Sequence, residues 1–297
     1  MSVEAFAIAV VVGLLVGVLS GLLGIGGGTI MVPIFRLGFG LSAIEATATS
    51  LFTIIPTSLS GCVTHIKNKT CIVPLGLAAG IGGAITSPLG VWLASISPAW
   101  LIMVAAAAII GYSAVNMLRK AFSKPKAASQ PTSQAASQST SRDAVQPTSQ
   151  GAVQPASQDA PRSAAPGDSA FKISRKHLLM GAAIGLGAGV ASGYVGVGGG
   201  FIMVPLFLSV IGIPMKRASG TSLIAVTILA IPGVIEQALL GNVHFMIGIA
   251  MAVGSIPGAV LGAQLVKRVP ERTLRIMFGA FLLLMAVVLV VNEVLAA

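Results

Sequence analysis

Long apolar stretches, separated by short polar or glycine-rich stretches, make up most of this chain. A helix needs about 20 consecutive apolar residues to cross a bilayer, and several of the stretches reach that length. They lie at about 5–23, 42–66, 72–94 and 99–118, and again at about 177–195, 218–240, 247–266 and 273–295. The pattern predicts an all-α polytopic membrane protein.

One stretch of sequence occurs twice. The first copy reads Gly17-Val-Leu-Ser-Gly-Leu-Leu-Gly-Ile-Gly-Gly-Gly-Thr-Ile-Met-Val-Pro-Ile-Phe35 and the second Gly189-Val-Ala-Ser-Gly-Tyr-Val-Gly-Val-Gly-Gly-Gly-Phe-Ile-Met-Val-Pro-Leu-Phe207, with thirteen of nineteen positions identical. Each copy joins an apolar helix to a short apolar segment, 29–38 or 200–213, through a glycine break. In lipid, an unwound segment survives only when it is buried in protein or lines a cavity. Paired breaks in two halves are the best sequence pointer to a transporter's binding site.

The second half of the chain repeats the first at a constant offset of 172 residues, so that Thr49-Ser50-Leu51 falls on Thr221-Ser222-Leu223. One ungapped register across such landmarks is a strong sign of internal duplication. We therefore expect two membrane repeats, residues 1–118 and 173–297. Each repeat has about five segments, with a broken helix at the glycine motif.

Residues 119–172, between the repeats, differ in composition. They are rich in Ala, Ser, Gln, Pro and Thr, and the sequence Gln130-Pro-Thr-Ser-Gln134 recurs at 146–150. Such a stretch cannot bury enough apolar surface to offset the entropy of ordering it. It is expected to be a disordered cytoplasmic linker.

Glycines recur every four residues in the first long segment of each repeat. They are Gly13, Gly17 and Gly21 in the first repeat and Gly181, Gly185, Gly189 and Gly193 in the second. Residues at this spacing share one helix face, and small residues there let membrane helices approach closely. The spacing predicts close helix packing.

The basic residues indicate which loops face the cytoplasm. If both short segments cross the membrane, five crossings per half place the lysines and arginines on one side, with Arg36 as the exception. By the positive-inside rule that side is cytoplasmic, and an odd number of crossings inverts the second repeat relative to the first. The alternative has four spans per half and re-entrant short segments, which makes the repeats parallel and spreads the basic loops over both faces.

The composition supports a membrane protein and argues against other classes. Hydrophobic residues make up 55% of the chain, charged residues 9%, and the mean hydropathy is +0.94, whereas soluble domains carry roughly 25% charged residues. The net charge of +10 comes from short loops, so the expected partner is the lipid bilayer and not nucleic acid. Cys62 and Cys71 give neither a metal spacing nor a disulfide framework, and no metal or cofactor is expected.

The paired Gly-Ile/Val-Gly-Gly-Gly…Pro motifs, each followed by Thr-Ser-Leu, resemble the TauE/SafE family of sulfite and organosulfonate exporters. The resemblance covers both membrane repeats and leaves out only the linker, whose length departs from the pattern expected of the family. It implies a multi-pass inner-membrane protein that exports a small sulfur-containing oxyanion, such as sulfite, sulfoacetate or a related organosulfonate. The motif does not define the substrate, because members are implicated with several organic anions.

The residues of the two motifs are suited to binding an anion. Helix N-termini present unpaired N–H groups and the positive end of the helix dipole, and glycine lets a ligand approach the backbone. The candidate substrate-binding residues are Gly26, Gly27, Gly28, Thr29, Thr49, Ser50, Gly198, Gly199, Gly200, Thr221 and Ser222. The alternative is structural: the glycines permit close helix crossings, and the hydroxyl groups bond to carbonyls one turn back.

Ionisable residues inside a membrane segment are candidates for a functional role. His65 and Glu236 are the candidates for proton coupling in this chain. His65 also lies one turn from a basic loop, so the alternative is that its side chain only reaches toward that loop.

Together these features predict a secondary transporter for a small anionic substrate. A membrane-embedded enzyme is disfavoured, because the segments hold no histidine cluster, no paired carboxylates and no Ser–His arrangement. A structural subunit would not need two matched breaks, and a channel would differ from a carrier in its kinetics. The anion, the direction, the coupling ion and the oligomeric state, including a homodimer, stay open.

Overall fold

The structure is a computed structural model that describes residues 3–122 and 174–296. Its elements are α1 (Val3–Leu23), α2 (Gly28–Phe39), α3 (Ala43–Lys67), α4 (Val73–Ile96), α5 (Ala99–Phe122), α6 (Arg175–Val195), α7 (Gly200–Leu206), the π-helix η1 (Phe207–Ile211), α8 (Met215–Leu239), α9 (Phe245–Leu265) and α10 (Glu271–Ala296). These two ranges contain no strand, and seven of their helices are long and apolar enough to span a membrane. The prediction of an all-α polytopic membrane protein is confirmed.

The helix boundaries follow the predicted segments to within a few residues. α5 continues to Phe122 and α6 begins at Arg175, so most of the expected linker, 119–172, lies outside the described residues. At the start of α3, Ser42 Oγ accepts a hydrogen bond from the Glu45 amide (3.3 Å), and the Glu45 carboxylate accepts one from the Ser42 amide (2.9 Å). This capping box satisfies two amides that the helix itself cannot bond.

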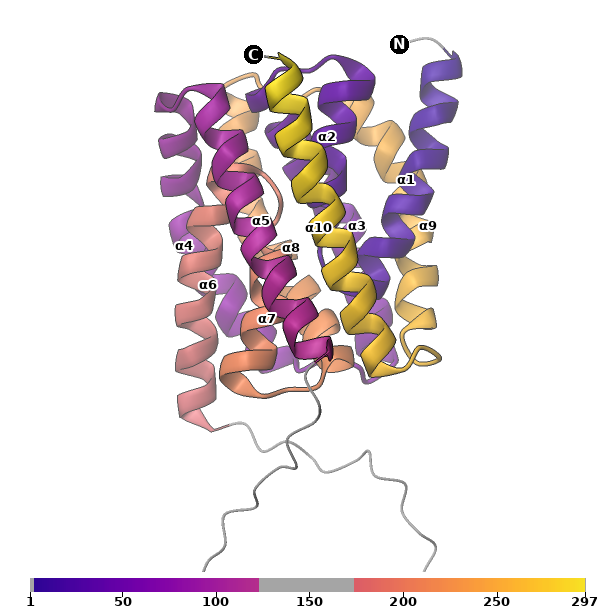
Figure 1. The fold of residues 1–297 in the computed structure, drawn as a ribbon, viewed down its shortest axis with the longest axis vertical. Helices are drawn as coiled ribbons and strands as arrows, with labels where there is room; N and C mark the ends of the chain where they lie inside the picture. The colour runs from indigo at the N-terminus through magenta and orange to yellow at the C-terminus, as the bar shows by residue number, and fades with distance from the viewer. Residues whose placement is uncertain (1–2, 123–173, 297) are drawn as a thin grey trace, which may run out of the picture. The chain divides into compact units, whose positions relative to one another are not determined.

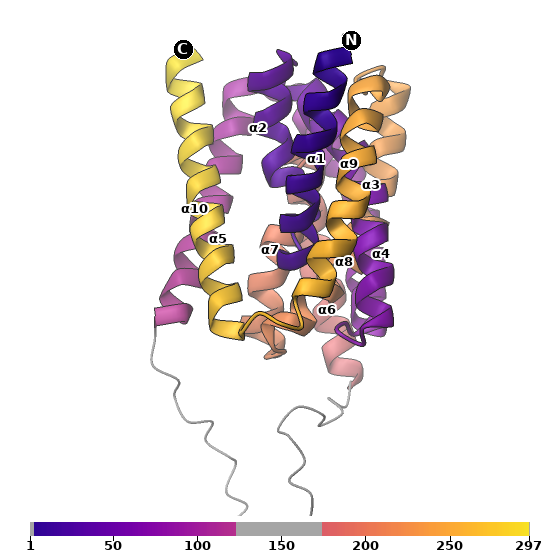
Figure 2. The same cartoon turned by 90° about the vertical axis from the view of Figure 1, so that its right-hand side faces the viewer.

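The two halves of the chain form one compact unit, in which helices of one half contact helices of the other. Figure 1 shows both ends of the chain at one end of this unit, and the end of α5 and the start of α6 at the opposite end. The equivalent helices α1 and α6 therefore run in opposite directions (Figures 1 and 2). Inverted repeats require these directions, and the inversion itself stays a prediction.

The two short segments are too short to cross a membrane. α2 has 12 residues, and α7 and η1 have 7 and 5, which gives about 18 Å of α-helix for twelve residues against a hydrocarbon core of roughly 30 Å. α2 lies in the half of the bundle nearest the two termini and α7 in the opposite half (Figures 1 and 2). From its break, α2 turns back toward the side where α1 begins, and α7 turns back toward the side where α6 begins. The expectation that both short segments cross the membrane is therefore corrected. α1 with α2, and α6 with α7, then form pairs that enter and leave on the same side, so three helices per half are left to cross. Three is odd, as five is, and the side on which each loop lies stays a prediction.

Glycine faces pack the long helices together across the two halves, as the spacing predicted. α1 lies against α9, and α6 lies against α4. A Cβ atom at Gly17 would lie 2.2 Å from the carbonyl oxygen of Ser255, and one at Gly185 would lie 2.0 Å from that of Ala79. Real Cβ atoms essentially never approach another heavy atom within 3.0 Å. Only glycine permits these backbone contacts, and the predicted packing role is confirmed.

α3 and α8 are the most buried of the long apolar helices. They cross at an apolar cluster that includes Leu51, Ile54, Val226 and Ala230. Ile54 and Val226 are equivalent residues of the two repeats, so the same positions of both halves meet at this crossing. α5 and α10 pack against each other along another side of the unit (Figure 2). The crossing of α3 and α8 provides the surface on which the glycine breaks rest.

Candidate functional site

Both glycine motifs form a buried break between a long helix and a short one. Three glycines at matching positions of each break have a positive φ: Gly24 (77°), Gly26 (80°), Gly27 (89°), Gly196 (71°), Gly198 (83°) and Gly199 (66°). Residues with a side chain seldom adopt this left-handed region. The glycine runs therefore allow the same loop in both halves, and each loop ends at the N-cap of the short helix.

The two breaks lie against each other. A Cβ atom at Gly28 would lie 2.6 Å from the carbonyl oxygen of Val197, and one at Gly200 would lie 2.7 Å from that of Gly24. Both breaks also contact the crossing of α3 and α8. The N-terminal ends of α2 and α7 therefore meet in the interior of the unit.

Some backbone N–H groups in the described part of the two breaks have no hydrogen-bond partner. Within the described residues, nothing accepts from the amides of Gly28 and Thr29 in the first turn of α2. At the second break the Gly200 amide donates to the Gly198 carbonyl (2.8 Å), while the Phe201 amide is unbonded within the same ranges. Unpaired amides at the positive end of a helix dipole attract anions. The structure brings the predicted backbone groups of both motifs into one buried region.

The two serines of the predicted Thr–Ser pairs hold the breaks across the repeats. Ser50 Oγ donates to the carbonyl of Gly196 (2.5 Å), and Ser222 Oγ donates to that of Gly24 (2.6 Å). Each is the other's equivalent at the offset of 172. A hydroxyl group has one hydrogen to donate. Ser50 uses it on the backbone of the opposite repeat, whereas Ser222 shares it between the Gly24 carbonyl of the opposite repeat and the Ser219 carbonyl of its own helix (2.8 Å).

The two threonines of these pairs form a second set of bonds between the repeats. Thr49 Oγ1 accepts from the His244 amide (3.0 Å) just before α9, and Thr221 Oγ1 accepts from the Ile72 amide (2.9 Å) just before α4. Thr221 also donates to the Arg217 carbonyl (2.6 Å). The threonines thus hold the starts of α9 and α4 through equivalent hydrogen bonds in the two halves.

Removing both serine hydroxyl groups is expected to destabilise the breaks. In the double variant Ser50→Ala/Ser222→Ala, the buried carbonyls of Gly196 and Gly24 lose their side-chain donors, at a cost of about 1–3 kcal/mol each. The melting temperature of the purified protein should fall clearly. Ser95→Ala is the control, because that hydroxyl group is exposed and bonds only within α4. A double variant that melts like the parent would show that these bonds do not hold the breaks.

The two candidates for proton coupling have different surroundings. His65 is fully buried, with Nε2 2.9 Å from the Gly21 carbonyl and Nδ1 2.7 Å from Thr70 Oγ1. A carbonyl can only accept, so Nε2 carries a hydrogen, and the ring ties the end of α3 to α1 beside the first break. Glu236, near the end of α8, has a buried Oε2 without a partner among the described residues. Both ring nitrogens of His65 already have hydrogen-bond partners, whereas Glu236 Oε2 has none among the described residues and can take a proton or a ligand.

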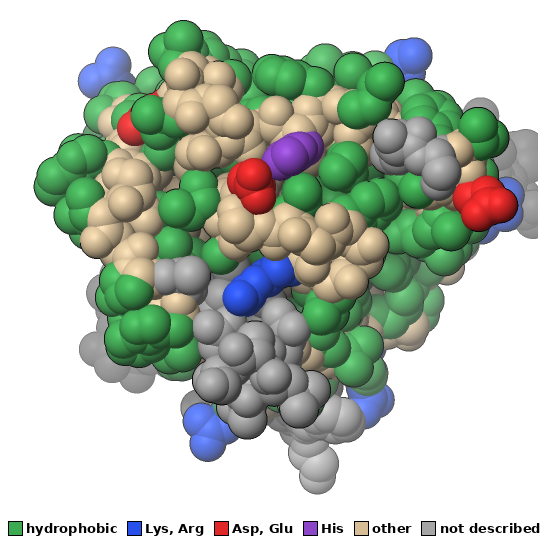
Figure 3. All heavy atoms as spheres, turned by 90° about the horizontal axis from the view of Figure 1, so that it is seen from above, with side chains coloured by type: hydrophobic (Ala, Val, Ile, Leu, Met, Phe, Trp, Pro, Cys, Tyr) green, Lys and Arg blue, Asp and Glu red, His purple; other side chains and the backbone are tan. Residues whose placement is uncertain are grey.

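An acid–histidine pair joins the two halves on the face that carries the termini. His244 Nε2 lies 3.0 Å from Glu45 Oε1, and the two side chains are 43% and 37% exposed. Figure 3 looks onto this face and shows a carboxylate beside a histidine. A separation of 199 residues along the chain explains why the sequence does not connect them.

Two serines that were not among the predicted residues lie beside the breaks. Ser20 and Ser192 are fully buried, and neither hydroxyl group has a partner within the described residues. A Cβ atom at Gly27 would lie 3.6 Å from Ser20 Cβ, and one at Gly199 would lie 3.4 Å from Ser192 Cβ. A signal for them exists in the sequence, since a serine occupies the same position in both copies of the motif.

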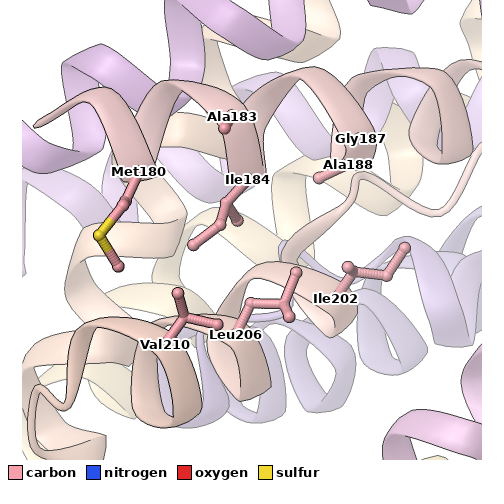
Figure 4. A pocket seen from close by; sticks show the side chains of 8 residues that line it. All are labelled: Met180, Ala183, Ile184, Gly187, Ala188, Ile202, Leu206 and Val210. Atoms are coloured by element: carbon pink, nitrogen blue, oxygen red, sulfur yellow. The ribbon is translucent and has the colours of Figure 1, made fainter. Parts of the chain in front are cut away.

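The cavities that flank α7 are poorly suited to an anion. One of about 490 Å³ lies between α6 and the α7–η1 segment, and its lining residues are apolar or glycine (Figure 4). Another of about 410 Å³ lies on the α5 side and includes Ser113 and Asn116 among mostly apolar residues. An apolar lining cannot replace the water lost by an ion. Within the described ranges, no three acidic, histidine or cysteine side chains gather as metal ligands would.

The chain is similar to curated membrane proteins along nearly its full length. It is 24% identical over 287 residues to the probable membrane transporter protein YunE of Bacillus subtilis (strain 168), covering 94% of this chain and 95% of that protein. It is 24% identical over 262 residues to the probable membrane transporter protein YdhB of the same organism, covering 88% and 90%. Over 106 residues it is 34% identical to the sulfite exporter TauE/SafE family protein 3 of Arabidopsis thaliana, covering 36% of this chain and 22% of that protein.

No solved structure matches the chain. The profile of the family described as sulfite exporter TauE/SafE matches residues 9–289, a range that contains both glycine breaks, the Thr–Ser pairs and the helices that hold them. The chain therefore belongs to the TauE/SafE family.

Proposed function

We propose that the protein is a secondary transporter that exports a small sulfur-containing oxyanion, such as sulfite, sulfoacetate or a related organosulfonate, across the inner membrane. The observation that carries the proposal is the meeting of two buried glycine breaks, where first-turn amides have no partner within the described residues. Half-helix N-termini at corresponding positions of two repeats are a recurring substrate site in transporters. Membership of the TauE/SafE family and the names of the relatives support the same class.

The proposed site binds its anion with uncharged donors. Neither glycine motif contains a lysine or an arginine between its first glycine and the end of the break. Backbone amides and the dipole of the short helix provide the attraction, and the buried position of the loops keeps water from competing. Binding without a fixed cation suits a carrier, because the substrate must also leave.

The two halves offer a physical basis for alternating access. α1 and α6 run in opposite directions (Figure 1), and hydrogen bonds such as Ser50 to Gly196 and Ser222 to Gly24 occur in equivalent pairs. We interpret the halves as inverted repeats around the breaks. Exchange of conformation between two inverted halves opens a central site first to one side and then to the other. In this scheme Glu236 is the candidate for proton coupling.

The test is transport by the purified protein in proteoliposomes. We expect saturable flux of at least one of sulfite, sulfoacetate, sulfate and taurine, and none in liposomes without protein. The transported anion should also raise the melting temperature, because a ligand that binds only the native state stabilises it by about 2.7 kcal/mol at 100 times its Kd. Correctly folded protein that moves none of these anions contradicts the proposal. A current that is linear in voltage and does not saturate would assign a channel instead.

A further inference from the structure

Many buried hydroxyl groups in the described residues donate to a carbonyl one helical turn back. Thr53 Oγ1, for example, donates to the Thr49 carbonyl at 2.9 Å. Serine and threonine in helices commonly bond in this way. Within the described residues, four buried hydroxyl groups have no partner at all: Ser20, Thr29, Ser87 and Ser192. Three of the four belong to the glycine motifs, so the exceptions gather at the candidate site.

Two of these hydroxyl groups stand at the N-terminus of α2. Thr29 lies in the first turn and is 1% exposed, and Ser20 is fully buried on α1, where it faces the N-cap Gly27. The amides of Gly28 and Thr29 are unbonded within the described residues. Within the described residues, two hydroxyl groups and two amides at or beside the start of one helix therefore have no acceptor. An oxyanion has oxygen lone pairs for all of them.

The second break does not repeat this donor set. Phe201 stands where the first break has Thr29, so one hydroxyl group is missing. The Gly200 amide is already used on the Gly198 carbonyl at 2.8 Å. α7 is only 7 residues long before the π-helix begins, against 12 for α2. Among the described residues, Ser192 is the one unpartnered hydroxyl group at this break.

We infer that the oxyanion group of the substrate binds at the first break only, with the hydroxyl groups of Ser20 and Thr29 as the side-chain contacts that determine specificity. The inference rests on the proposed anion transport. A buried hydroxyl group without a partner destabilises a fold, and an apolar group of the same shape is neutral or stabilising in its place. If the bound anion is the hydrogen-bond partner of Ser20 and Thr29, the presence of two such hydroxyl groups beside one helix N-terminus is explained.

The inference is tested with the full-length protein and three matched variants. Ser20→Ala and Thr29→Val each remove a proposed contact, and Ser192→Ala removes the equivalent hydroxyl group at the second break. Affinity for sulfite and for sulfoacetate is measured by calorimetry, and the melting temperature is measured without anion. We expect Ser20→Ala and Thr29→Val to weaken binding by at least about tenfold and to melt at or above the parental temperature. Ser192→Ala should change affinity by less than about twofold.

Thr53→Val is the control for the loss of a buried hydroxyl group that has a partner in the protein. It should lower the melting temperature and leave affinity unchanged. If Ser192→Ala weakens binding as much as Ser20→Ala, a site at the first break alone is overturned. If Ser20→Ala and Thr29→Val lower the melting temperature but bind normally, the two hydroxyl groups are structural and the inference is also overturned. A parent protein that binds neither of these anions, and neither sulfate nor taurine, contradicts the proposed function, and the inference falls with it.

Discussion

Replacing Gly185 by alanine is expected to lower the free energy of unfolding by about 3 kcal/mol, the upper end of the range for overpacking a core. The new methyl group would lie 2.0 Å from the carbonyl oxygen of Ala79, on the facing helix α4. A backbone carbonyl cannot turn aside as a flexible side chain can, so α4 and α6 must separate along their contact. Thermal denaturation of the purified protein measures the effect.

The neighbouring Gly187 provides a matched control on the same helix. It is exposed, and a Cβ atom there would meet nothing within 4 Å. Alanine is the better helix former by about 1 kcal/mol in water, so Gly187→Ala should melt at or above the parental temperature. Equal melting of the Gly185→Ala and Gly187→Ala variants would show that α4 and α6 tolerate a wider spacing than the structure has.

Much of this fold can be predicted from the sequence, because its signals are local or periodic. The length of the apolar stretches gives the helix boundaries to within a few residues, and α5 and α6 begin or end close to where the composition changes. The spacing of Gly17 and Gly185 with their neighbours marks faces that do pack backbone against backbone. The offset of 172 residues identifies the two breaks as equivalent positions of the repeats from the sequence alone.

The chemistry of the candidate site is less accessible to sequence reasoning, because it depends on how the two halves dock. The hydrogen bond from Ser50 to Gly196 joins residues 146 positions apart, and the one from Ser222 to Gly24 joins residues 198 apart. A Thr–Ser pair looks the same in a sequence whether its hydroxyl group serves a ligand or a carbonyl. The unpartnered Ser20 is the reverse case, because a serine in an apolar helix is expected to bond one turn back and does not do so here.

Gly24→Ala is expected to have an even larger effect, because strain and collision act at the same position. Gly24 has a φ of 77°, a conformation that costs an L-residue roughly 1–2 kcal/mol. Its new methyl group would also lie 2.4 Å from the backbone of Ser219 on α8. The variant should melt below Gly185→Ala, and it should lose anion flux because the carbonyl that binds Ser222 moves with the loop.

Two single-cause variants separate these contributions. Gly40→Ala has strain alone, since Gly40 has a φ of 66° and open space within 4 Å, and Gly185→Ala has collision alone. Because both effects act at Gly24, the cost of Gly24→Ala should exceed the cost of either of these two variants. If Gly24→Ala melts only as early as Gly40→Ala, the loop has relaxed away from α8 without penalty. The first break would then keep its conformation without support from the second repeat.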